Sequence, residues 1–372
     1  MKPLQGIRVV ELARVLAGPW CGQLLADLGA EVIKVERPGA GDDTREWGPP
    51  FVTGADGEDL SAAYYHSCNR GKQSVAIDIA SEAGQAEVRA LLADADVVIE
   101  NYKVGGLVKY GLDLARLRTD FPQLVVCSIT GFGQTGPYAH RAGYDYIVQA
   151  MSGFMSLTGD PDGPPQKAGI AYADIFTGMY SAVAILAALR RRDVTGVGAH
   201  VDMALLDSQV AVLANQAANY LASGVVPKRM GNAHVNVVPY QVFATADGQL
   251  VIAVGNDSQY RKLCAILGVP EWADDARFAN NAGRLANRTE LIPLLAAKIA
   301  AWDAQPLSLA LEAEGVPAGP INDLAGVFAD PQVIARGMRF RPEGASIDGV
   351  ASPIVIDGER MVATTGAPPR AG

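Results

Sequence analysis

The sequence predicts an α/β protein, with a mainly parallel sheet domain followed by a smaller α+β domain. In the first half of the chain, short runs rich in Val and Ile alternate with helical stretches, which is typical of a parallel sheet covered by helices. Beyond residue 224, two strand patterns flank an Asp-Gly turn, which indicates a β-hairpin. The 372 residues, 49% of them hydrophobic, suffice for two domains.

The strands of the first half are short and hydrophobic. We expect them at residues 7–12, 31–36, 74–79, 96–101 and 124–130. Helical stretches at 18–28 and 82–93 lie between them. The carboxyl ends of parallel strands gather at one edge of a sheet, so an active site is expected there.

The second half has a different organisation. Residues 240–245 and 249–254 are the expected arms of the hairpin, and Pro317–Ala318–Gly319–Pro320 interrupts the chain again. Helical patterns follow at residues 257–267, 284–302 and 306–314. We expect a large domain over residues 1–200, completed by the tail at about 341–372, and a small domain over 225–320.

Composition and motifs exclude several classes of function. The net charge of −9 disfavours a general nucleic-acid binder. The four cysteines and four histidines have no metal-ligand spacing, so no metal site is expected. The turn after the first strand lacks the glycine fingerprint of a dinucleotide enzyme, and neither a phosphate loop nor a serine-hydrolase elbow is present. No signal segment and no bilayer-length apolar run are recognised, so a cytoplasmic protein is expected.

Asp174 lies at a junction between a loop and a helix. Gly and Pro are frequent in residues 159–165, whereas apolar residues recur at helical spacing after Asp174. A carboxylate there suits a helix N-cap. It also suits catalysis, because a helix N-terminus favours an oxyanion and a loop leaves the acid accessible. Spacing alone leaves both interpretations open.

Several motifs together resemble one family. ELARVLAGP at residues 11–19, LGAEVIKVERP at 28–38 and GDDTR at 41–45 look like the opening of the family III coenzyme A transferases, which include formyl-CoA transferase and carnitine CoA-transferase. Further matches are NRGK at 69–72, VIENY at 98–102, GFGQTGP at 131–137, Tyr144–Asp145 and Gly231–Asn232. The resemblance therefore covers almost the whole chain.

The resemblance implies covalent catalysis by Asp174. In this family an aspartate attacks an acyl-CoA thioester, and the CoA thiolate then forms a thioester with that aspartate. The implied activity is transfer of CoA from an acyl-CoA, with succinyl-CoA as a candidate, to a small carboxylic acid. A CoA thioester is then a co-substrate, and no permanently bound cofactor is expected.

The resemblance also assigns binding residues. Those implied to contact CoA are Leu16, Ala17, Arg37, Ile77, Asn101, Tyr102, Lys103, Lys109 and Tyr144. Tyr144, Asn232 and His234 are implied to contact the substrate acid. Arg45, Arg70 and Lys72 are further candidates for the phosphates of CoA, although each alone is more simply a surface charge.

The family's architecture implies a Rossmann-like sheet domain and an interlocked homodimer. Two ring-shaped subunits are linked in that assembly, and each ring is closed by two linkers, which fall here at residues 201–224 and 321–340. Folding and association are difficult to separate in such a dimer.

Two other functions remain as alternatives. An α-methylacyl-CoA racemase shares the fold but pairs its aspartate with a histidine, whereas this chain has Gly143–Tyr144–Asp145 at that place. A non-catalytic CoA-thioester-binding protein is the third possibility.

Leu16 stands where formyl-CoA transferases have glutamine, which disfavours a formate or oxalate specialist. The sequence does not identify the acceptor acid. The family's range includes small dicarboxylates such as succinate or glutarate as candidates and, with less support, a cationic acid such as carnitine.

Overall fold

The protein is described by a computed structural model that covers residues 1–54 and 57–371. The chain forms two compact units. The first comprises Met1–Met155, Lys167–Val225 and Pro331–Gly372, and the second comprises Ser156–Gln166 and Val226–Asp330. The short helix α6 (Phe154–Leu157) spans a point where the chain passes from one unit to the other.

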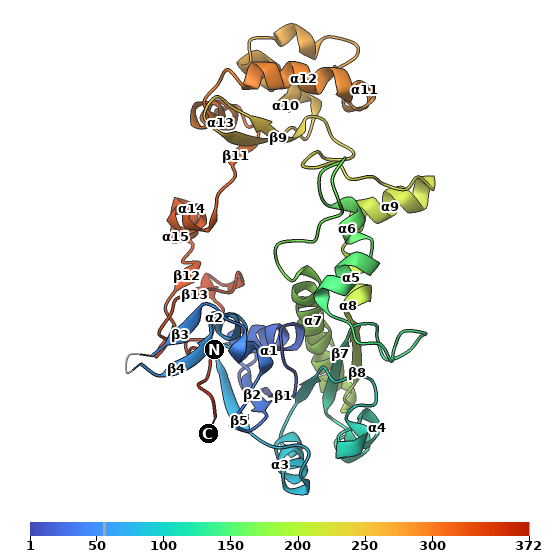
Figure 1. The fold of residues 1–372 in the computed structure, drawn as a ribbon, viewed down its shortest axis with the longest axis vertical. Coiled ribbons are helices and arrows are strands. Elements are labelled where there is room, and N and C mark those ends of the chain that lie inside the picture. The colour runs from blue at the N-terminus through green and yellow to red at the C-terminus, as the bar shows by residue number, and fades with distance from the viewer. Residues whose placement is uncertain (55–56, 372) are drawn as a thin grey trace. The chain divides into compact units, whose positions relative to one another are not determined.

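A parallel sheet organises the first unit (Figure 1). In spatial order its strands are β5 (Lys72–Ala76), β2 (Glu31–Glu36), β1 (Arg8–Glu11), β6 (Val97–Glu100), β7 (Val125–Thr130) and β8 (His200–Ala204). All neighbouring strands run parallel. The register pairs Val10 with Ile33 on one side of β1 and with Val98 on the other.

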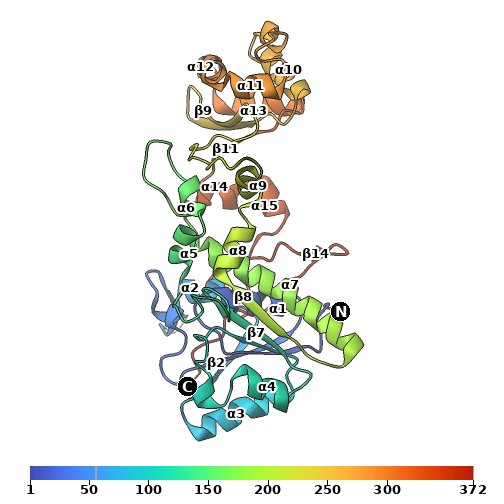
Figure 2. The ribbon, with the colours of Figure 1, turned by 90° about the vertical axis from the view of Figure 1, so that its right-hand side faces the viewer.

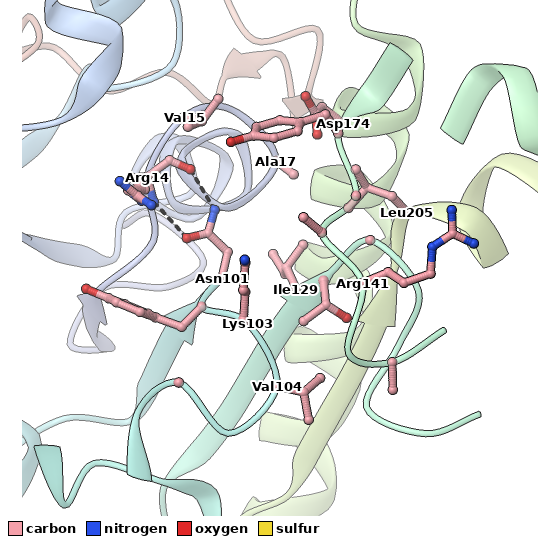
Figure 3. A pocket seen from close by; sticks show the side chains of 18 of the residues that line it. Arg14, Val15, Ala17, Asn101, Lys103, Val104, Ile129, Arg141, Asp174 and Leu205 are labelled. Atoms are coloured by element: carbon pink, nitrogen blue, oxygen red, sulfur yellow. Dashed lines mark hydrogen bonds between the residues drawn. The ribbon is translucent and has the colours of Figure 1, made fainter. Parts of the chain in front are cut away.

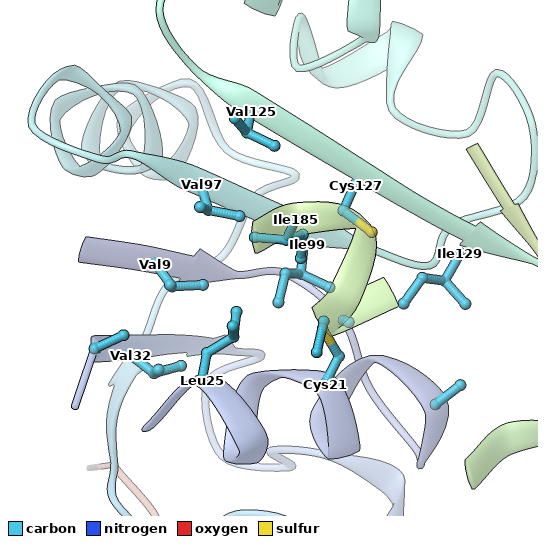
Figure 4. Close-up of a cluster of buried hydrophobic side chains, with 14 of the residues drawn as sticks. Val9, Cys21, Leu25, Val32, Val97, Ile99, Val125, Cys127, Ile129 and Ile185 are labelled. Carbon is cyan, nitrogen blue, oxygen red and sulfur yellow. The ribbon is translucent and has the colours of Figure 1, made fainter. Parts of the chain in front are cut away.

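Alternate residues of the strands pack into cores on opposite faces of the sheet. Val97 and Ile99 belong to a core with α1 (Ala17–Asp27) and α7 (Tyr172–Thr195), shown in Figure 4. Val98 belongs to a second core with α3 (Glu82–Ala93) and α4 (Leu114–Asp120). The sheet is therefore buried on both faces, as expected for parallel strands.

Helix α7 lies beside β7 and β8 (Figure 2). It is long and apolar enough to cross a membrane by length and composition alone, although the sequence suggested no such run. Ile185 and Leu189 are buried in the core, and a core helix passes the same test. The apolar character of α7 is thus partly explained by packing.

Smaller elements complete the first unit. Its remaining helices are α2 (Ala63–Ser67), α5 (Asp145–Met151), α8 (Leu205–Ala211), α9 (Ala214–Ser223) and α15 (Pro331–Ala335). Three antiparallel pairs join β3 (Phe51–Thr53) to β4 (Asp59–Ala62), β12 (Arg339–Phe340) to β13 (Gly349–Val350), and β14 (Val355–Ile356) to β15 (Glu359–Arg360). Single 3-10 turns lie at Asp43–Glu46 and Val108–Tyr110.

The second unit contains an antiparallel sheet together with several helices. Strand β10 (Gln249–Ala253) pairs with β9 (Tyr240–Ala244) and β11 (Ala318–Pro320). The helices are α10 (Asp257–Ile266), α11 (Asn281–Ala286), α12 (Arg288–Ile299), α13 (Ala304–Ala313) and α14 (Leu324–Ala329), with a 3-10 turn at Pro270–Ala273. Its separate core includes Leu250, Leu263 and Leu295.

The expected and observed elements differ in several places. The expected linker at residues 321–340 contains α14, α15 and β12, and the strand expected at 74–79 is β5 at Lys72–Ala76. Residues 201–224, expected as a linker, contain most of β8 together with α8 and α9, and β8 is an edge strand of the main sheet. The single helix expected over residues 284–302 is interrupted at Asn287, which lies between α11 and α12. The Asn287 side chain donates a hydrogen bond to the Gly283 carbonyl, which competes with helical continuation.

Candidate active site

Asp174 lies in the first turn of α7. The N-cap of this helix is Ala171, which makes no capping hydrogen bond, so Asp174 is the third helical residue and the N-cap interpretation is wrong. A carboxylate at this position points from a helix end that favours negative charge. Figure 3 shows Asp174 at the edge of a cavity, near Ala17 of α1.

A second carboxylate, Asp145, supports the start of α7. Its Oδ1 accepts a hydrogen bond from the backbone N–H of Ala173 at 2.8 Å. Its Oδ2 accepts from Nε2 of Gln149 at 2.7 Å, and Oε1 of Gln149 accepts from the N–H of Ala168 at 2.9 Å. Asp145, and not Asp174, therefore accepts a hydrogen bond from a backbone N–H in the first turn of α7.

The environment of Asp174 favours its protonated form. Burial raises the pKa of Asp174 to about 7, and the negative charge of Asp145 adds to the effect. Both effects outweigh the stabilisation of the anion by the helix N-terminus. A carboxyl group with a pKa near neutrality and access to a cavity is a candidate catalytic group.

The cavity beside Asp174 has a volume of about 370 Å³. It is lined by most of the sequence-predicted site residues, which come from the loops after β1, β6 and β7 and from α1 and α7. Those that line it are Leu16, Ala17, Asn101, Tyr102, Lys103, Lys109, Tyr144 and Asp174. Tyr144 is 65% exposed and is the N-cap residue of α5. The carboxyl edge of the sheet thus holds the cavity, as predicted for a parallel sheet.

A second cavity, of about 310 Å³, holds the remaining predicted CoA contacts of this unit. Arg37 and Ile77 line it, together with Tyr102, which also lines the first cavity. Arg37 is exposed and follows directly after β2. Ile77 is buried, so the exposed cation of Arg37 is the feature of this cavity that suits a phosphorylated ligand.

The chain matches the family described as "CoA-transferase family III" over residues 4–372. This chain belongs to CoA-transferase family III. It is 60% identical over 357 residues to the succinate–glutarate CoA-transferase of Agrobacterium fabrum, covering 95% of this chain and 89% of that protein. The succinyl-CoA:glutarate CoA-transferase of Mus musculus is 46% identical over 353 residues, with 95% of this chain and 80% of that protein covered.

A solved structure agrees with this assignment. The crystal structure of a CAIB/BAIF family protein from Brucella suis matches with a TM-score of 0.88 and 57% identity, covering 99% of this chain and 96% of that one. The resemblance drawn from the sequence motifs is therefore confirmed, and the protein is a CoA-transferase.

Three basic residues form buried ion pairs. The sequence had suggested them as candidates for binding the phosphates of CoA. Arg45 binds Glu36 at 2.6 Å, Arg70 binds Asp27 at 2.6 Å, and Lys72 binds Glu11 at 2.8 Å. All three cations are buried, which argues against a contact with the phosphates of CoA and shows that the alternative of a surface charge is wrong. A sequence does not distinguish an exposed cation from one whose partner lies far along the chain.

Two residues near Asp174 carried no predicted role. The charges of Asp174 and Asp145 both contribute to raising the pKa of Tyr64, after the larger effect of burial, so this phenol lies within electrostatic reach of the site and keeps its proton. Its ring packs edge-on against Trp47 at 5.3 Å. No spacing signal singles out Tyr64, whereas Asp145 was part of a matching motif without an assigned task.

Asn232 and His234 of the transferase belong to the second unit. Asn232 is exposed. Nδ1 of His234 accepts a hydrogen bond from the N–H of Asn236 at 3.0 Å, and the His234 ring packs against Tyr240 at 5.2 Å. Their suggested contact with the acceptor acid stays a prediction.

Metal chemistry has no candidate site in the part of the chain that the structure describes, which holds no group of three His, Cys, Asp or Glu side chains suited to a metal ion.

Proposed function

We propose that this CoA-transferase moves CoA from succinyl-CoA to a small dicarboxylic acid, with Asp174 as the nucleophile. The observation that carries the proposal is the carboxylate of Asp174 on the first turn of α7, in a cavity with Leu16 and Ala17. The names of the similar Agrobacterium and mouse enzymes support succinate and glutarate as the acids.

The proposed reaction divides one exchange into balanced steps. A carboxylate oxygen of Asp174 attacks the thioester carbon, and the bond from carbon to sulfur breaks to release the CoA thiolate. The thiolate attacks the carboxyl carbon of Asp174 in the resulting anhydride, which releases succinate and leaves an enzyme–CoA thioester. An incoming carboxylate takes up CoA by the reverse steps.

In this proposal, much of the rate enhancement comes from holding the Asp174 carboxylate against the thioester. A carboxylate is a weak nucleophile toward a thioester, but holding the two groups together can replace about 7–11 kcal/mol of the barrier. The raised pKa of Asp174 reflects a poorly solvated carboxylate, which is more reactive once it ionises. The N–H groups at the start of α1 are suitable donors for a developing oxyanion.

The cations of the two cavities suit the remainder of CoA. Lys103 and Lys109 line the first cavity, and Arg37 lines the second. Nζ of Lys109 lies 4.7 Å from the ring centre of Tyr110, a residue that lines both cavities. We assign these three cations to the phosphate groups and Ile77 to the adenine.

The working form in this proposal is an interlocked homodimer in the cytoplasm. Support comes from apolar side chains that the first unit leaves exposed on α7 and α9: Met179, Tyr180, Val183, Tyr220 and Leu221. The four cysteines are free thiols, which suits a reducing compartment. Light scattering on the purified protein tests the dimer.

Mass spectrometry tests the nucleophile. The protein is mixed with succinyl-CoA without acceptor, and the peptide containing Asp174 is expected to gain CoA with loss of one water. The adduct should disappear in Asp174→Ala and persist in Asp193→Ala, an exposed aspartate at the far end of the same helix. Absence of any adduct, with solvent deuterium entering the α-carbon of a branched acyl-CoA, would favour a racemase.

A further inference from the structure

The loop between β1 and α1 contains a strained residue. Val15 has a φ of +72°, in the left-handed region that β-branched residues seldom adopt. Such a conformation persists only where the surrounding structure determines it, and it is concentrated at functional sites. Val15 lines the cavity that contains Asp174.

A buried carboxylate holds this strained residue. Both side-chain oxygens of Asp42 lie 3.3 Å from the backbone nitrogen of Val15, which donates its N–H to them. Thr44 donates its N–H at 3.0 Å and its hydroxyl at 2.8 Å to Oδ1 of Asp42. Asp42 is only 2% exposed, so its rotamer and charge are fixed by these partners.

Lys34 fixes Asp42 in turn. Its Nζ lies 2.9 Å from Oδ2 of Asp42 and 2.9 Å from Oε1 of Glu11. The same ammonium donates a hydrogen bond to the carbonyl of Ala13 at 2.8 Å. Backbone groups on both sides of Arg14 therefore depend on one buried cation, since Ala13 binds it directly and Val15 binds it through Asp42.

The residue between these two anchors is also clamped. The N–H of Arg14 donates to Oδ1 of Asn101 at 3.1 Å, and Nδ2 of Asn101 donates to the Arg14 carbonyl at 2.6 Å (Figure 3). Asn101 thus fixes Arg14, but it makes no contribution to the φ angle of Val15 through these bonds. Asp42 remains the group that satisfies the N–H of the strained residue.

We propose that Asp42, held by Lys34, is a positioning residue that keeps Val15 left-handed and thereby fixes Leu16 and Ala17 at the cavity wall beside Asp174. Leu16 is the N-cap of α1 and has an irregular backbone, with φ −135° and ψ −57°. The turn at Val15 immediately precedes Leu16 and the first residues of α1. This inference rests on the proposed role of Asp174.

The test is a set of Val15 variants in two backgrounds, wild type and Asp42→Asn. The asparagine keeps the shape of Asp42, but its amide group places a donor against either Lys34 or the Val15 N–H. We expect Asp42→Asn to lower kcat by on the order of tenfold, with a smaller change in KM for succinyl-CoA. Val15→Gly should restore most of this loss, because glycine adopts positive φ without strain.

The order of the variants separates positioning from general destabilisation. In the Asp42→Asn background, kcat should follow Gly > Asn > Ala at position 15, the order of tolerance for positive φ. In the wild-type background, the variants with Gly, Asn or Ala at position 15 should differ little from one another in kcat. Equal activities across the series, or no recovery with Val15→Gly, would overturn the proposal.

Asp27→Asn is the matched control. Asp27 is equally buried, binds Arg70 at 2.6 Å and accepts the N–H of Ala363 at 2.8 Å, but it lies at the opposite end of α1. It should lower thermal stability with kcat unchanged; a loss of kcat equal to that of Asp42→Asn would contradict the proposal. If Asp42→Asn does not fold, Thr44→Val is used instead. It removes only the hydroxyl that donates a hydrogen bond to the Asp42 carboxylate, so it loosens that carboxylate with less disruption.

The assay also separates this proposal from the assignment of Asp174. Turnover and the mass of the Asp174 peptide are measured on the same samples. If no adduct forms in the wild-type protein, the nucleophile assignment fails, whereas the dependence of turnover on residue 15 still decides the role of Asp42.

Discussion

Gly178 packs against the carbonyl oxygen of Ala17: a β-carbon placed on Gly178 would lie 2.7 Å from that oxygen and 3.1 Å from the side chain of Trp20. Gly178 is one turn after Asp174 on α7, and Ala17 begins α1. The missing side chain therefore allows the N-terminal turns of two helices to meet, which brings Asp174 and the β1–α1 loop to one cavity.

Gly178→Ala should separate these helices. We expect a loss of stability of about 1–3 kcal/mol, because the backbone of Ala17 cannot move as a flexible side chain would. A drop in kcat on the order of tenfold should accompany it, since small misplacement of reacting groups is costly. Thermal melts and succinyl-CoA turnover measure both effects. Gly169→Ala is the control expected to be neutral, because no heavy atom beyond Gly169 and its two chain neighbours lies within 4 Å of the position that its β-carbon would take.

The activity should rise with pH through neutrality. Asp174 must ionise to attack, and its pKa is raised to about 7, so kcat/KM for succinyl-CoA should increase from pH 6 to 8. Asp145→Asn should move this limb to lower pH, because the amide oxygen still accepts the Ala173 N–H while the negative charge is lost. If the pH profile of Asp145→Asn is unchanged, the charge of Asp145 does not contribute to the raised pKa of Asp174.

Asp174 should reduce stability progressively as the pH rises from 3.8, its unfolded pKa, to about 7, its folded pKa. Its pKa in the folded protein lies above its unfolded value of 3.8, so folding favours the protonated form, and stability falls as pH rises through this range. Asp174→Asn should therefore be more stable than the wild type at pH 8, by about 1–2 kcal/mol after allowance for partial exposure. Denaturant melts at pH 5 and pH 8 test this, and the gain should shrink at pH 5.

Arg37→Ala should weaken binding of the CoA ester. Loss of one charge-assisted contact is expected to raise KM for succinyl-CoA by on the order of tenfold with little change in kcat. The effect should diminish at high salt, because Arg37 is exposed. Arg190→Ala, an exposed arginine on α7, is the matched control. A fall in kcat without a change in KM would argue against a phosphate contact.

Local patterns predicted much of the sheet domain. β2 and α3 have the expected bounds, because a run of β-branched residues and a Ser-capped amphipathic segment each carry their own signal. β8 was missed, since the polar residues His200 and Asp202 interrupt its apolar character at the edge of the sheet. Its pairing with β7 decides its conformation.

The motif match assigned Asp174, Leu16, Ala17 and Asn101 to one site, and in the structure these residues line one cavity. Their contact with CoA stays a prediction. The motif match did not show that Arg45, Arg70 and Lys72 form buried ion pairs, because their partners come from other elements. Nor did it identify Asp145 as the support of α7.

The amino-acid sequence predicted the parallel sheet, the β-hairpin, the family and a carboxylate near the start of a helix, all of which are present. These features depend on local periodicity, on turn residues and on motifs that are continuous along the chain. The raised pKa of Asp174 and the positive φ of Val15 could not be predicted from such patterns and are seen in the three-dimensional fold. Both depend on burial and on charges brought together from distant segments, Asp145 for the first and Asp42 with Lys34 for the second.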